Sequence, residues 1–591
     1  MTRAHTHEVK ECEKAEKISI SAYLCMRLKE LGCDHIFGVP GDFSLSFLNV
    51  ILKSEVKYIN TCNELNAAYA ADSYARIRGI GALSTTFVVG ELSAINGIAG
   101  SFSEDVPVVH IGSAPATAHH KKKTLLHHSL YDYSISKRMY DMITIDSVKI
   151  DNKESAARDI DRVLINCIKH SKPVYIQLCA DYTNELIDKP TSPLKIEHRK
   201  SNESNLDTVM KQILSLLKKS QQPVFMPGYE LLRFRKTELM KELLEVSKIP
   251  FATMIMGKTV ISEHHPLYIG LYFGKKGDPH VTQYIEESDC LMIIGEKLMD
   301  FNTGFFSATL PENHTLHCNF GKATIGDCSV DEVFVEDIIE RLIQAYKSGE
   351  LKPYNFQSAT PPYPQAMHRF THRPQKRLAL ERHHTLSLDR MFDTVVSSLP
   401  EGVNVLAETG TSLFSASEVM IPNNSQFFGQ SFFGSIGYTV GGLVGLCFAS
   451  PKRTFAFIGD GSLQVTVQDI STILKNKHNP VIVIINNDGY TIERVICDHP
   501  YNDIAMWRYS KLAKLFGFKD IPSFITRTEG EFEHAFTYAL KHPETTCIIE
   551  VVVEKMDCNH TLKCLGKEMA INSNVLEEEQ QPSPKRLKSE A

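Results

Sequence analysis

The chain has 591 residues, and its 64 Lys and Arg against 70 Asp and Glu give a formal net charge of −6. Single hydrophobic cores stop growing at about 250–300 residues, so this length predicts three or four domains. Because the net charge is close to neutral, the protein has no general electrostatic attraction for nucleic acid or anionic membranes. The content of 43% hydrophobic residues excludes global disorder. No apolar run approaches the ~18 residues that span a bilayer. The segment Met1–Lys17 lacks the apolar core of a signal peptide, so we expect a cytoplasmic protein with no membrane or nucleic-acid partner.

Fourteen cysteines are spread from Cys12 to Cys564, and no two of them form a Cys-x-x-Cys pair. Without a secretory signal, they are expected to be reduced thiols that mostly fill small apolar positions in the interior. The lack of paired cysteines also argues against a structural zinc site.

Short apolar runs rich in β-branched residues alternate with helical patterns along most of the chain. Runs without polar alternation are typical of strands buried on both faces of a parallel sheet. The pattern recurs three times, so we expect an α/β protein of three domains, each a mainly parallel sheet flanked by helices. The clearest predicted strands are Val106–Ile111, Val174–Leu178, Cys290–Ile294, Thr454–Ile458 and Val481–Ile485.

Two polar stretches divide the chain. Lys189–Asn205 has two prolines and no hydrophobic periodicity, and Tyr354–His384 has four prolines and a basic cluster that we interpret as a solvated crossover. Domains are therefore expected at 18–190, 205–353 and 385–556, with a linker at 354–384. Residues 557–591 are expected to form a flexible tail, because Glu577–Ala591 is charged and of low complexity.

The segment Phe457–Asn487 is the most informative part of the chain. A predicted strand leads into Gly-Asp-Gly-Ser at 459–462, and a helix is predicted to begin near Ser462. Apolar residues then recur at spacings of four, three and four, which is one face of a helix. These residues are Leu463, Val467, Ile470 and Leu474. The next strand ends at Asn486-Asn487, so both motifs lie at carboxyl ends of parallel strands, where α/β folds bind ligands.

This arrangement predicts a site for a divalent metal and a phosphate. Asp460 supplies an anionic oxygen, Asn487 an amide oxygen, and the backbone near Gly489 a carbonyl. Oxygen ligands with few protein charges suit Mg²⁺, which completes its shell with phosphate and water. The glycines let the backbone approach a ligand, and the helix N-terminus offers N–H groups to an anion. Two unrelated turns are the alternative, but Gly-Asp-Gly joined to Asn-Asn at this spacing is specific.

The same segment resembles the thiamin diphosphate motif, in which Gly-Asp-Gly is followed some 25 residues later by Asn-Asn. Over about Ile18–Val553 the chain resembles the pyruvate/indolepyruvate/phenylpyruvate decarboxylase family, with matching stretches in all three predicted domains. These stretches are Ile36–Asn49, Cys62–Arg76, Val88–Glu104, Leu125–Leu130, Met256–Gly270, Asp300–Gly304, Ala407–Phe414, Gly434–Tyr438 and Asn486–Arg494.

The resemblance implies a pyrimidine-binding, a central and a diphosphate-binding domain, each with the thiamin diphosphate-binding fold. It also implies thiamin diphosphate and Mg²⁺ as cofactors and a small 2-oxo acid as substrate. Active sites would lie between the pyrimidine domain of one subunit and the diphosphate domain of another, which implies a homodimer or a homotetramer.

Roles at the cofactor can be assigned to residues that match the family's motifs. Glu64 matches the glutamate that hydrogen-bonds the pyrimidine ring, and a buried glutamate without such a partner would be costly. Ile436 matches the aliphatic side chain that wedges the cofactor into its bent form, with an ordinary core isoleucine as the alternative. Asp460, Asn487 and the Gly489 carbonyl match the metal ligands. The cofactor-binding set is Glu64, Thr409, Gly410, Thr411, Ser435, Ile436, Gly461, Ser462, Asn487, Tyr490, Ile492 and Glu493.

Four residues besides Glu64 match the family's catalytic acid–base set: Asp42, His127, His128 and Glu493. A decarboxylase must protonate the carbon that CO₂ leaves and remove a hydroxyl proton to release the aldehyde. Histidines and carboxylates drawn together in a dry cleft suit such transfers. The sequence does not assign each transfer to one group, because such a set titrates as a coupled system.

Several positions depart from the pattern of the pyruvate decarboxylases. After the histidine pair the family usually continues Thr-Leu-Gly-Asn-Gly-Asp-Phe, whereas this chain has Ser129–Tyr133 and a shorter loop without the glycines. Phe432-Phe433 and Leu413 stand where pyruvate enzymes usually have Leu-Trp and Ala. These segments resemble those of fungal phenylpyruvate decarboxylases, which act on 2-oxo acids from transaminated aromatic and branched amino acids in Ehrlich-type catabolism. One methylene in an apolar pocket changes discrimination by only ~1–3 kcal/mol, so we expect a broad substrate range.

Three other functions stay open. One is the pyruvate decarboxylase of alcoholic fermentation, and another is a carboligase of the acetolactate synthase type. The third is a catalytically idle protein that senses thiamin diphosphate and regulates transcription. Pro584–Lys588 is a basic cluster that resembles a nuclear import signal and would give a nuclear fraction, with a solvated tail as the alternative. The presence of the complete acid–base set argues against an idle protein.

Overall fold

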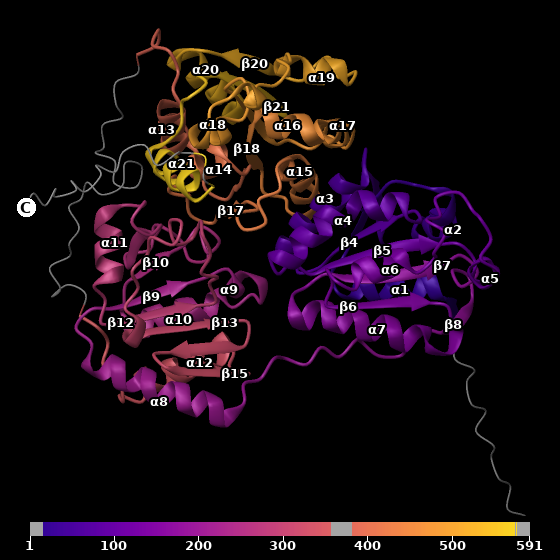
Figure 1. Ribbon diagram of the computed structural model, residues 1–591, viewed down its shortest axis with the longest axis horizontal. Helices are drawn as coiled ribbons and strands as arrows, with labels where there is room; N and C mark the ends of the chain where they lie inside the picture. Colours follow the sequence, from indigo (N-terminus) through magenta and orange to yellow (C-terminus); the bar gives the residue numbers. More distant parts are fainter. Residues whose placement is uncertain (1–15, 356–380, 574, 576–591) are drawn as a thin grey trace, which may run out of the picture. The chain divides into compact units, whose positions relative to one another are not determined.

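The computed structural model describes residues 16–355, 381–573 and 575 (Figure 1). It divides the chain into two compact units between Glu197 and His198. The predicted basic cluster near the C-terminus and most of the linker at 354–384 lie outside the described residues.

The first unit is built on a six-stranded sheet in the order β3-β2-β4-β5-β7-β6, and every neighbouring pair is parallel. Figure 1 shows α3 and α4 on one side of this sheet and α1 and α7 on the other. A two-stranded antiparallel ribbon pairs β1 (Lys17–Ser19) with β8 (Leu186–Asp188). The sheet strands are β2 His35–Gly38, β3 Lys57–Asn60, β4 Gly81–Thr85, β5 Val108–Ala114, β6 Asp146–Ile150 and β7 Val174–Cys179. The helices are α1 Ile20–Glu30, α2 Leu45–Ile51, α3 Glu64–Arg78, α4 Val89–Ser103, α5 Thr117–Lys122, α6 Ile135–Tyr140 and α7 Lys153–His170.

The second unit holds two sheets. Its first sheet has the order β11-β10-β9-β12-β13-β14-β15, parallel as far as β13 and antiparallel at β14 and β15. The strands are β9 Pro223–Pro227, β10 Phe251–Thr253, β11 Tyr268–Leu271, β12 Cys290–Ile294, β13 Thr315–Asn319, β14 Lys322–Ile325 and β15 Cys328–Asp331. The helices are α8 Glu203–Lys219, α9 Glu230–Arg233, α10 Thr237–Ser247, α11 Pro279–Glu286 and α12 Val335–Lys347.

The other sheet of this unit has the order β17-β16-β18-β19-β21-β20 and is parallel throughout. Its strands are β16 Asn404–Ala407, β17 Gln426–Phe428, β18 Thr454–Gly459, β19 Val481–Asn486, β20 Ser523–Thr526 and β21 Cys547–Val552. The helices are α13 Leu388–Ser398, α14 Thr411–Ser417, α15 Tyr438–Ala449, α16 Asp460–Thr466, α17 Ile470–Lys475, α18 Thr491–Ile496, α19 Leu512–Leu515, α20 Glu529–Lys541 and α21 His560–Asn572.

These sheets confirm the predicted α/β architecture with mainly parallel sheets. Each of the five predicted strands is present, with ends shifted by no more than three residues, and their apolar runs are buried on both faces. The mixed edge of the β9–β15 sheet was not predicted, because β14 and β15 are short and partly exposed.

A buried ion pair ties the two sheets of the second unit together. The ammonium group of Lys258 lies 2.5 Å from a carboxylate oxygen of Glu263, and both side chains are almost fully buried. The other Glu263 oxygen accepts a hydrogen bond from the backbone N–H of Ile421 at 2.7 Å. Because breaking a buried pair leaves an uncompensated charge, this contact strongly couples the regions around β10 and β17.

The predicted linker at 189–205 contains the division between the two units, whereas the expectation of a flexible tail is wrong in part. The stretch 189–205 ends in ordered structure, since Asn202 caps α8 and the Arg199 guanidinium is buried, with ion pairs to Glu230 at 2.9 Å and Glu336 at 2.7 Å. The expected tail at 557–591 includes the helix α21, which places Leu562 and Leu565 in a hydrophobic core. The low-complexity composition that suggested a flexible tail begins only after this helix.

The helix expected near Ser462 begins two residues earlier, at Asp460. It is also not continuous, because a 3₁₀ turn at Val467–Asp469 separates α16 from α17. All four residues of its predicted apolar face are nevertheless buried.

In the described part of the chain no cysteine forms a disulfide, and no helix there is long and apolar enough to cross a membrane.

Candidate active site

Asp42 is positioned by a tight turn beyond the carboxyl end of β2. It begins the 3₁₀ helix Asp42–Ser44, in which the Ser44 hydroxyl accepts a hydrogen bond from the Gly41 N–H at 3.0 Å and donates to its carbonyl at 2.8 Å. A Cβ on Gly41 would lie only 2.4 Å from that of Thr86. The turn therefore needs glycine, which lets it pack against the end of β4.

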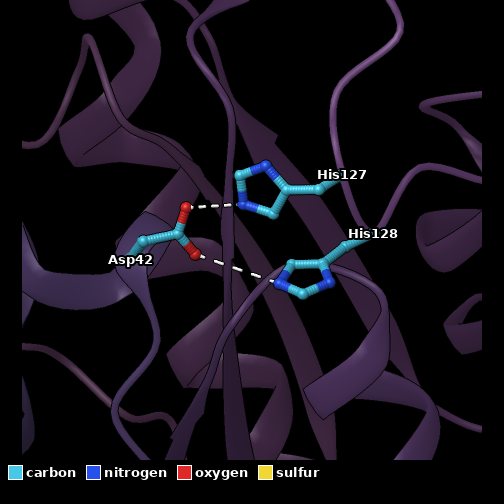
Figure 2. Close-up of side chains that lie close together, drawn as sticks. All are labelled: Asp42, His127 and His128. Carbon is cyan, nitrogen blue, oxygen red and sulfur yellow. Dashed lines mark hydrogen bonds and ion pairs between the residues drawn. The ribbon is translucent and has the colours of Figure 1, made fainter.

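The structure brings Asp42 together with both predicted histidines (Figure 2). One Asp42 oxygen lies 2.7 Å from Nε2 of His127, and the other lies 4.0 Å from Nε2 of His128. In this chain alone all three side chains are open to solvent, with 52%, 60% and 31% of their areas exposed. The carboxylate can therefore orient His127 directly, as an acid–base pair requires.

Aromatic packing fixes the histidine pair from one side. The ring of Phe43 stacks on His127 at a centroid distance of 5.0 Å and meets His128 edge-on at 6.2 Å. His128 itself has a φ of +66°, an uncommon backbone conformation for a residue other than glycine. The shorter loop after His128, which lacks the family's glycines, thus does not prevent the pair from reaching Asp42.

Glu64 is the first residue of α3, at the carboxyl edge of the same sheet. The helix is capped by Asn63, whose side chain accepts a hydrogen bond from the Asn66 N–H at 2.8 Å. A Cβ on Gly90 would lie 3.1 Å from the Glu64 carboxylate, so Gly90 leaves this group room. In the chain alone Glu64 is half-buried. The predicted cost of burying it therefore arises only if another surface covers it.

Asp460 follows β18 directly and is fully buried. Its carboxylate accepts hydrogen bonds from the N–H groups of Gly461 at 2.8 Å and Gly489 at 3.1 Å. Burial raises its pKa to about 6, and the nearby negative charge of Asp488 contributes. A cation beside this carboxylate would offset the cost of its burial.

The Asn487 amide completes a set of converging polar atoms. The end of the amide that faces Asp460 lies 3.0 Å from the Gly489 carbonyl oxygen and 3.2 Å from Asp460 Oδ1. With the NH₂ group there, it donates to both oxygens. With the carbonyl oxygen there, three oxygens converge at separations close to the ~3 Å between neighbouring ligands of an octahedral Mg²⁺ with 2.0–2.1 Å bonds. The residues present therefore fit a magnesium ion.

Two glycines in this region are required by close approach. Gly489 has a φ of +126°, and a Cβ there would lie 2.3 Å from the Asn502 carbonyl oxygen. A Cβ on Gly461 would lie 2.5 Å from the ring of Tyr490. These contacts hold the loop after β19 against the start of α16.

The loops that match the cofactor-binding motifs also meet in the second unit. Cβ positions built on Gly434 and Gly410 would lie 3.8 Å from Thr409 and 3.7 Å from Ile492, respectively. Gly410 has a φ of +106° and precedes α14, which Thr411 begins. The Ser435 N–H donates to the Gln430 side chain at 2.9 Å. Three predicted segments are thus adjacent to one another.

Ile436 is 37% exposed, so the alternative interpretation as an ordinary core isoleucine is wrong. Phe432 on the same loop is 38% exposed. Leu413, in contrast, is fully buried in the hydrophobic core, so it does not present its side chain at this surface.

Two buried residues of this region were missed by sequence reasoning. The carboxylate of Glu408 accepts hydrogen bonds from the N–H groups of Thr409 at 3.1 Å and Thr439 at 3.0 Å, and burial raises its pKa to about 7. The Arg494 side chain donates to the Asn487 carbonyl at 3.2 Å and pairs with Asp503 at 2.6 Å. A charged residue directly after an apolar strand was the available signal for Glu408.

Glu493 lies on α18 with its side chain exposed, next to buried Arg494. It belongs to the second unit, whereas Asp42, His127, His128 and Glu64 belong to the first. The structure therefore groups the predicted residues into two partial sites, one on each unit.

Comparison with known proteins covers both partial sites. Residues 18–134 match the family "Thiamine pyrophosphate enzyme, N-terminal TPP binding domain", 210–345 its central domain and 408–551 its C-terminal TPP binding domain. The chain is 35% identical to pyruvate decarboxylase isozyme 1 of Saccharomyces cerevisiae over 88% of this chain and 92% of that protein. It is 33% identical to the alpha-keto-acid decarboxylase of Mycobacterium leprae over 96% and 98%, and 33% identical to pyruvate decarboxylase 1 of Arabidopsis thaliana over 92% and 90%.

The fold and the matched domains define a three-domain thiamin diphosphate enzyme. Within that class, the chain belongs to the thiamin diphosphate-dependent 2-oxo acid decarboxylase family. It is a decarboxylase of 2-oxo acids, and its family uses thiamin diphosphate with a divalent metal, typically Mg²⁺.

Proposed function

We propose that the preferred substrates are phenylpyruvate, indolepyruvate and other 2-oxo acids from transaminated aromatic and branched amino acids. The observation that carries this proposal is a pair of exposed apolar side chains beside the Thr409 loop. Phe432 and Ile436 are 38% and 37% exposed, and Gly434 between them approaches Thr409. An aromatic substrate side chain can bury apolar area there that pyruvate lacks, at roughly 25 cal/mol per Å².

Asp460, Asn487 and the Gly489 carbonyl are proposed to hold the Mg²⁺. Thr409, Gly410, Thr411, Ser435, Gly461, Ser462, Tyr490 and Ile492 are proposed to line the cofactor, and Ile436 to support its bent form. Glu64 is proposed to hold a proton against the pyrimidine ring. When bound, thiamin diphosphate supplies a nucleophilic carbon and an acceptor for the electron pair that CO₂ leaves behind.

The reaction consumes one proton, because hydrogen replaces CO₂ on the carbonyl carbon of the product aldehyde. We propose that Asp42, His127, His128 and Glu493 deliver that proton and remove the hydroxyl proton when the aldehyde leaves. The 2.7 Å contact between Asp42 and Nε2 of His127 supports a shared proton at that pair. Glu493 can join the set only if the second unit faces the first unit of the same or another subunit.

Kinetics on purified protein with thiamin diphosphate and Mg²⁺ test the substrate proposal. We expect kcat/KM for phenylpyruvate and indolepyruvate to exceed that for pyruvate. A Phe432→Leu variant should lower the ratio of kcat/KM for phenylpyruvate to that for pyruvate by roughly 5–150-fold, in line with ~1–3 kcal/mol of pocket discrimination. The matched control is Phe306→Leu, a change at an exposed phenylalanine elsewhere on the second unit. A clear preference of the parent for pyruvate would reject the aromatic assignment.

Pyruvate decarboxylase activity is the second candidate, because two of the relatives above carry that name. An idle regulator that senses thiamin diphosphate is the third. CO₂ release by the parent and its loss in Glu64→Gln would exclude the idle protein, while thiamin diphosphate binding by both would show that the variant is folded.

We further propose a cytoplasmic homodimer or homotetramer in which Glu64 of one subunit and Ile436 of another meet across an interface. The support is the half-buried state of Glu64 and the exposed state of Ile436 in the chain alone. Sedimentation velocity with and without the cofactors tests this assembly, and an active monomer would contradict it.

A further inference from the structure

The first unit contains a pocket of about 360 Å³, lined mainly by polar and charged residues, that none of Asp42, His127, His128 or Glu64 lines. It lies among α5, α6 and the loop after His128, against strands β6 and β7. The lining residues on which the argument rests are His120, Lys123, Tyr133, Lys137, Lys149 and Gln177.

The side-chain amide of Gln177 lines this pocket without a hydrogen-bond partner among the described residues. Its side chain is 1% exposed, and neither its amide oxygen nor its nitrogen makes a hydrogen bond of normal geometry within the described chain. Its neighbour on the strand, the Tyr175 hydroxyl, already donates to Glu91. Nε2 of His120 is likewise buried without a partner among the described residues. A buried polar group without a partner costs about 1–3 kcal/mol, so these atoms favour a polar ligand.

The walls of the pocket carry more positive than negative side chains. Lys123, Lys137, Arg138 and Lys149 line it, with Asp132 as the one lining carboxylate. Three of these cations are held by ion pairs, Lys137 with Asp141 at 2.9 Å, Arg138 with Asp132 at 2.7 Å and Lys149 with Asp151 at 3.1 Å. Asp141 and Asp151 do not line the pocket, so they can fix the two lysines from behind.

We propose that this pocket binds a small oxyanion, either inorganic phosphate or a short carboxylate, between the lysines and the Gln177 amide. Its volume is at the lower end of the range of small-molecule sites, which suits a ligand of this size. Anionic oxygens form charge-assisted hydrogen bonds with lysine, and a ligand hydroxyl can donate to the Gln177 carbonyl. Phosphate monoanion and hydroxy-carboxylates such as malate offer both groups.

A chain of ring contacts leads from this pocket to His127. His120 stacks on Tyr133 at 4.5 Å, and Tyr133 stacks on Phe87 at 5.6 Å. Phe87 meets Phe43 edge-on at 5.8 Å, and Phe43 stacks on His127 at 5.0 Å. Because packed rings transmit displacement, an anion that moves His120 or Tyr133 changes the position of His127 relative to Asp42.

Calorimetric titration of the full-length holoenzyme with phosphate and separately with malate tests the binding, against chloride at equal ionic strength. We expect saturable binding of at least one anion. The affinity should fall about tenfold or more in Lys149→Met, which keeps the apolar stem, and in Gln177→Leu. Lys121→Met is the matched control, since Lys121 lies on α5 outside the pocket lining.

The pair of anions distinguishes the ligand source, because phosphate-only binding identifies a phosphate site and malate-only binding a carboxylate site. No saturable binding of either anion would overturn the proposal. Equal affinity in the parent and Lys149→Met would also overturn it, and this surface variant stays informative if Gln177→Leu does not fold.

The coupling to His127 rests on the proposed catalytic role of that residue, whereas the binding does not. We expect a saturating anion to shift the pH profile of kcat/KM in the parent and in Lys121→Met but not in Lys149→Met. An unchanged profile at measured saturation would refute the coupling. An enzyme inactive on every 2-oxo acid would instead refute the proposed function and leave the titration result standing.

Discussion

The side-chain amide of Asn487 lies 3.0 Å from the carbonyl oxygen of Gly489, two residues further along the chain. This contact is possible because Gly489 adopts a φ of +126° and turns its carbonyl back toward the end of β19. Asp460 stands 3.2 Å from the same end of the amide. Asp460 and the Gly489 carbonyl thus lie within 3.2 Å of one end of the Asn487 amide, a spacing that suits the magnesium site proposed above.

Removal of the metal should destabilise the parent but not an Asp460→Asn variant. The ion bound to the parent adds stability that grows with its concentration relative to its Kd, about 2.7 kcal/mol at 100 times Kd. We expect EDTA to lower the Tm of the parent and to leave that of the variant unchanged. Differential scanning fluorimetry with and without Mg²⁺ measures both. An equal effect of EDTA on the two proteins would place the metal elsewhere.

Gly489→Ala should abolish metal-dependent activity and destabilise the fold by roughly 2–3 kcal/mol or more. The added Cβ would lie 2.3 Å from the Asn502 carbonyl and 2.8 Å from the Arg494 guanidinium, so the loop must shift. Gly402→Ala is the matched control, because Gly402 has a φ of +73° but no atom within 4 Å of its Cβ position. The Gly402→Ala substitution should lower the free energy of unfolding only by the ~1 kcal/mol of backbone strain. If Gly489→Ala and Gly402→Ala lowered the Tm equally, the close approach of Asn502 to Gly489 would not be important for stability.

Asp42→Asn should lower kcat/KM for the best 2-oxo acid by about 100-fold or more while the fold is preserved. The neutral amide cannot stabilise a protonated His127, and acid–base groups typically contribute 10²–10⁴-fold. Steady-state kinetics with circular dichroism measure both effects. Asp188→Asn serves as control, since Asp188 is an exposed carboxylate of the same unit paired with Lys17. Parent-like kinetics in the Asp42 variant would remove this residue from the mechanism.

Glu296 should make the protein less stable as the pH rises. It is fully buried, one of its oxygens has no hydrogen-bond partner among the described residues, and burial raises its pKa to about 8. The folded protein then keeps this proton up to about pH 8, whereas the unfolded chain releases it near its ordinary pKa of 4.5. The stability from this group is therefore complete below pH 4.5 and is lost as the pH rises through about 8.

A Glu296→Gln variant should remove this pH dependence and gain up to roughly 3 kcal/mol over the parent at pH 7. Urea unfolding of both proteins between pH 5 and 9 measures the difference. Glu287→Gln, a change at an exposed position nearby, should follow the parent curve. Parallel curves for the parent and Glu296→Gln would contradict the raised pKa.

The parallel strands could be predicted from sequence, and the proposed metal set could be located from it, because both depend on short segments. The run Val481–Ile485 is apolar at every position and can only be buried, and Asp460 and Asn487 each follow a predicted strand after one intervening residue. The exposure of Ile436 could not be predicted in this way, since an isoleucine in a glycine-rich loop fits a core as well as a surface. Arg494 was missed because its partners are backbone carbonyls and Asp503, a carboxylate nine residues away in a loop, and neither gives a local sequence signal.

Helix α21 was missed for a related reason. Its sequence has few strongly apolar residues, and its burial depends on contacts with distant segments. Asn559 at its N-terminus donates to the Phe414 carbonyl at 3.1 Å, a partner 145 residues earlier. The hydrophobic pattern within a short stretch of sequence does not reveal such a long-range contact.

The position of α21 has a consequence for synthesis of the protein. A Cβ on Gly566 would lie 2.3 Å from Val495, so this helix supports α18, the helix that presents Glu493. Domains fold as they emerge from the ribosome, N-terminal segments first. Because α21 emerges after α18 and every strand of its sheet, a nascent chain must wait for its last segments before the surface that carries Glu493 gains its support.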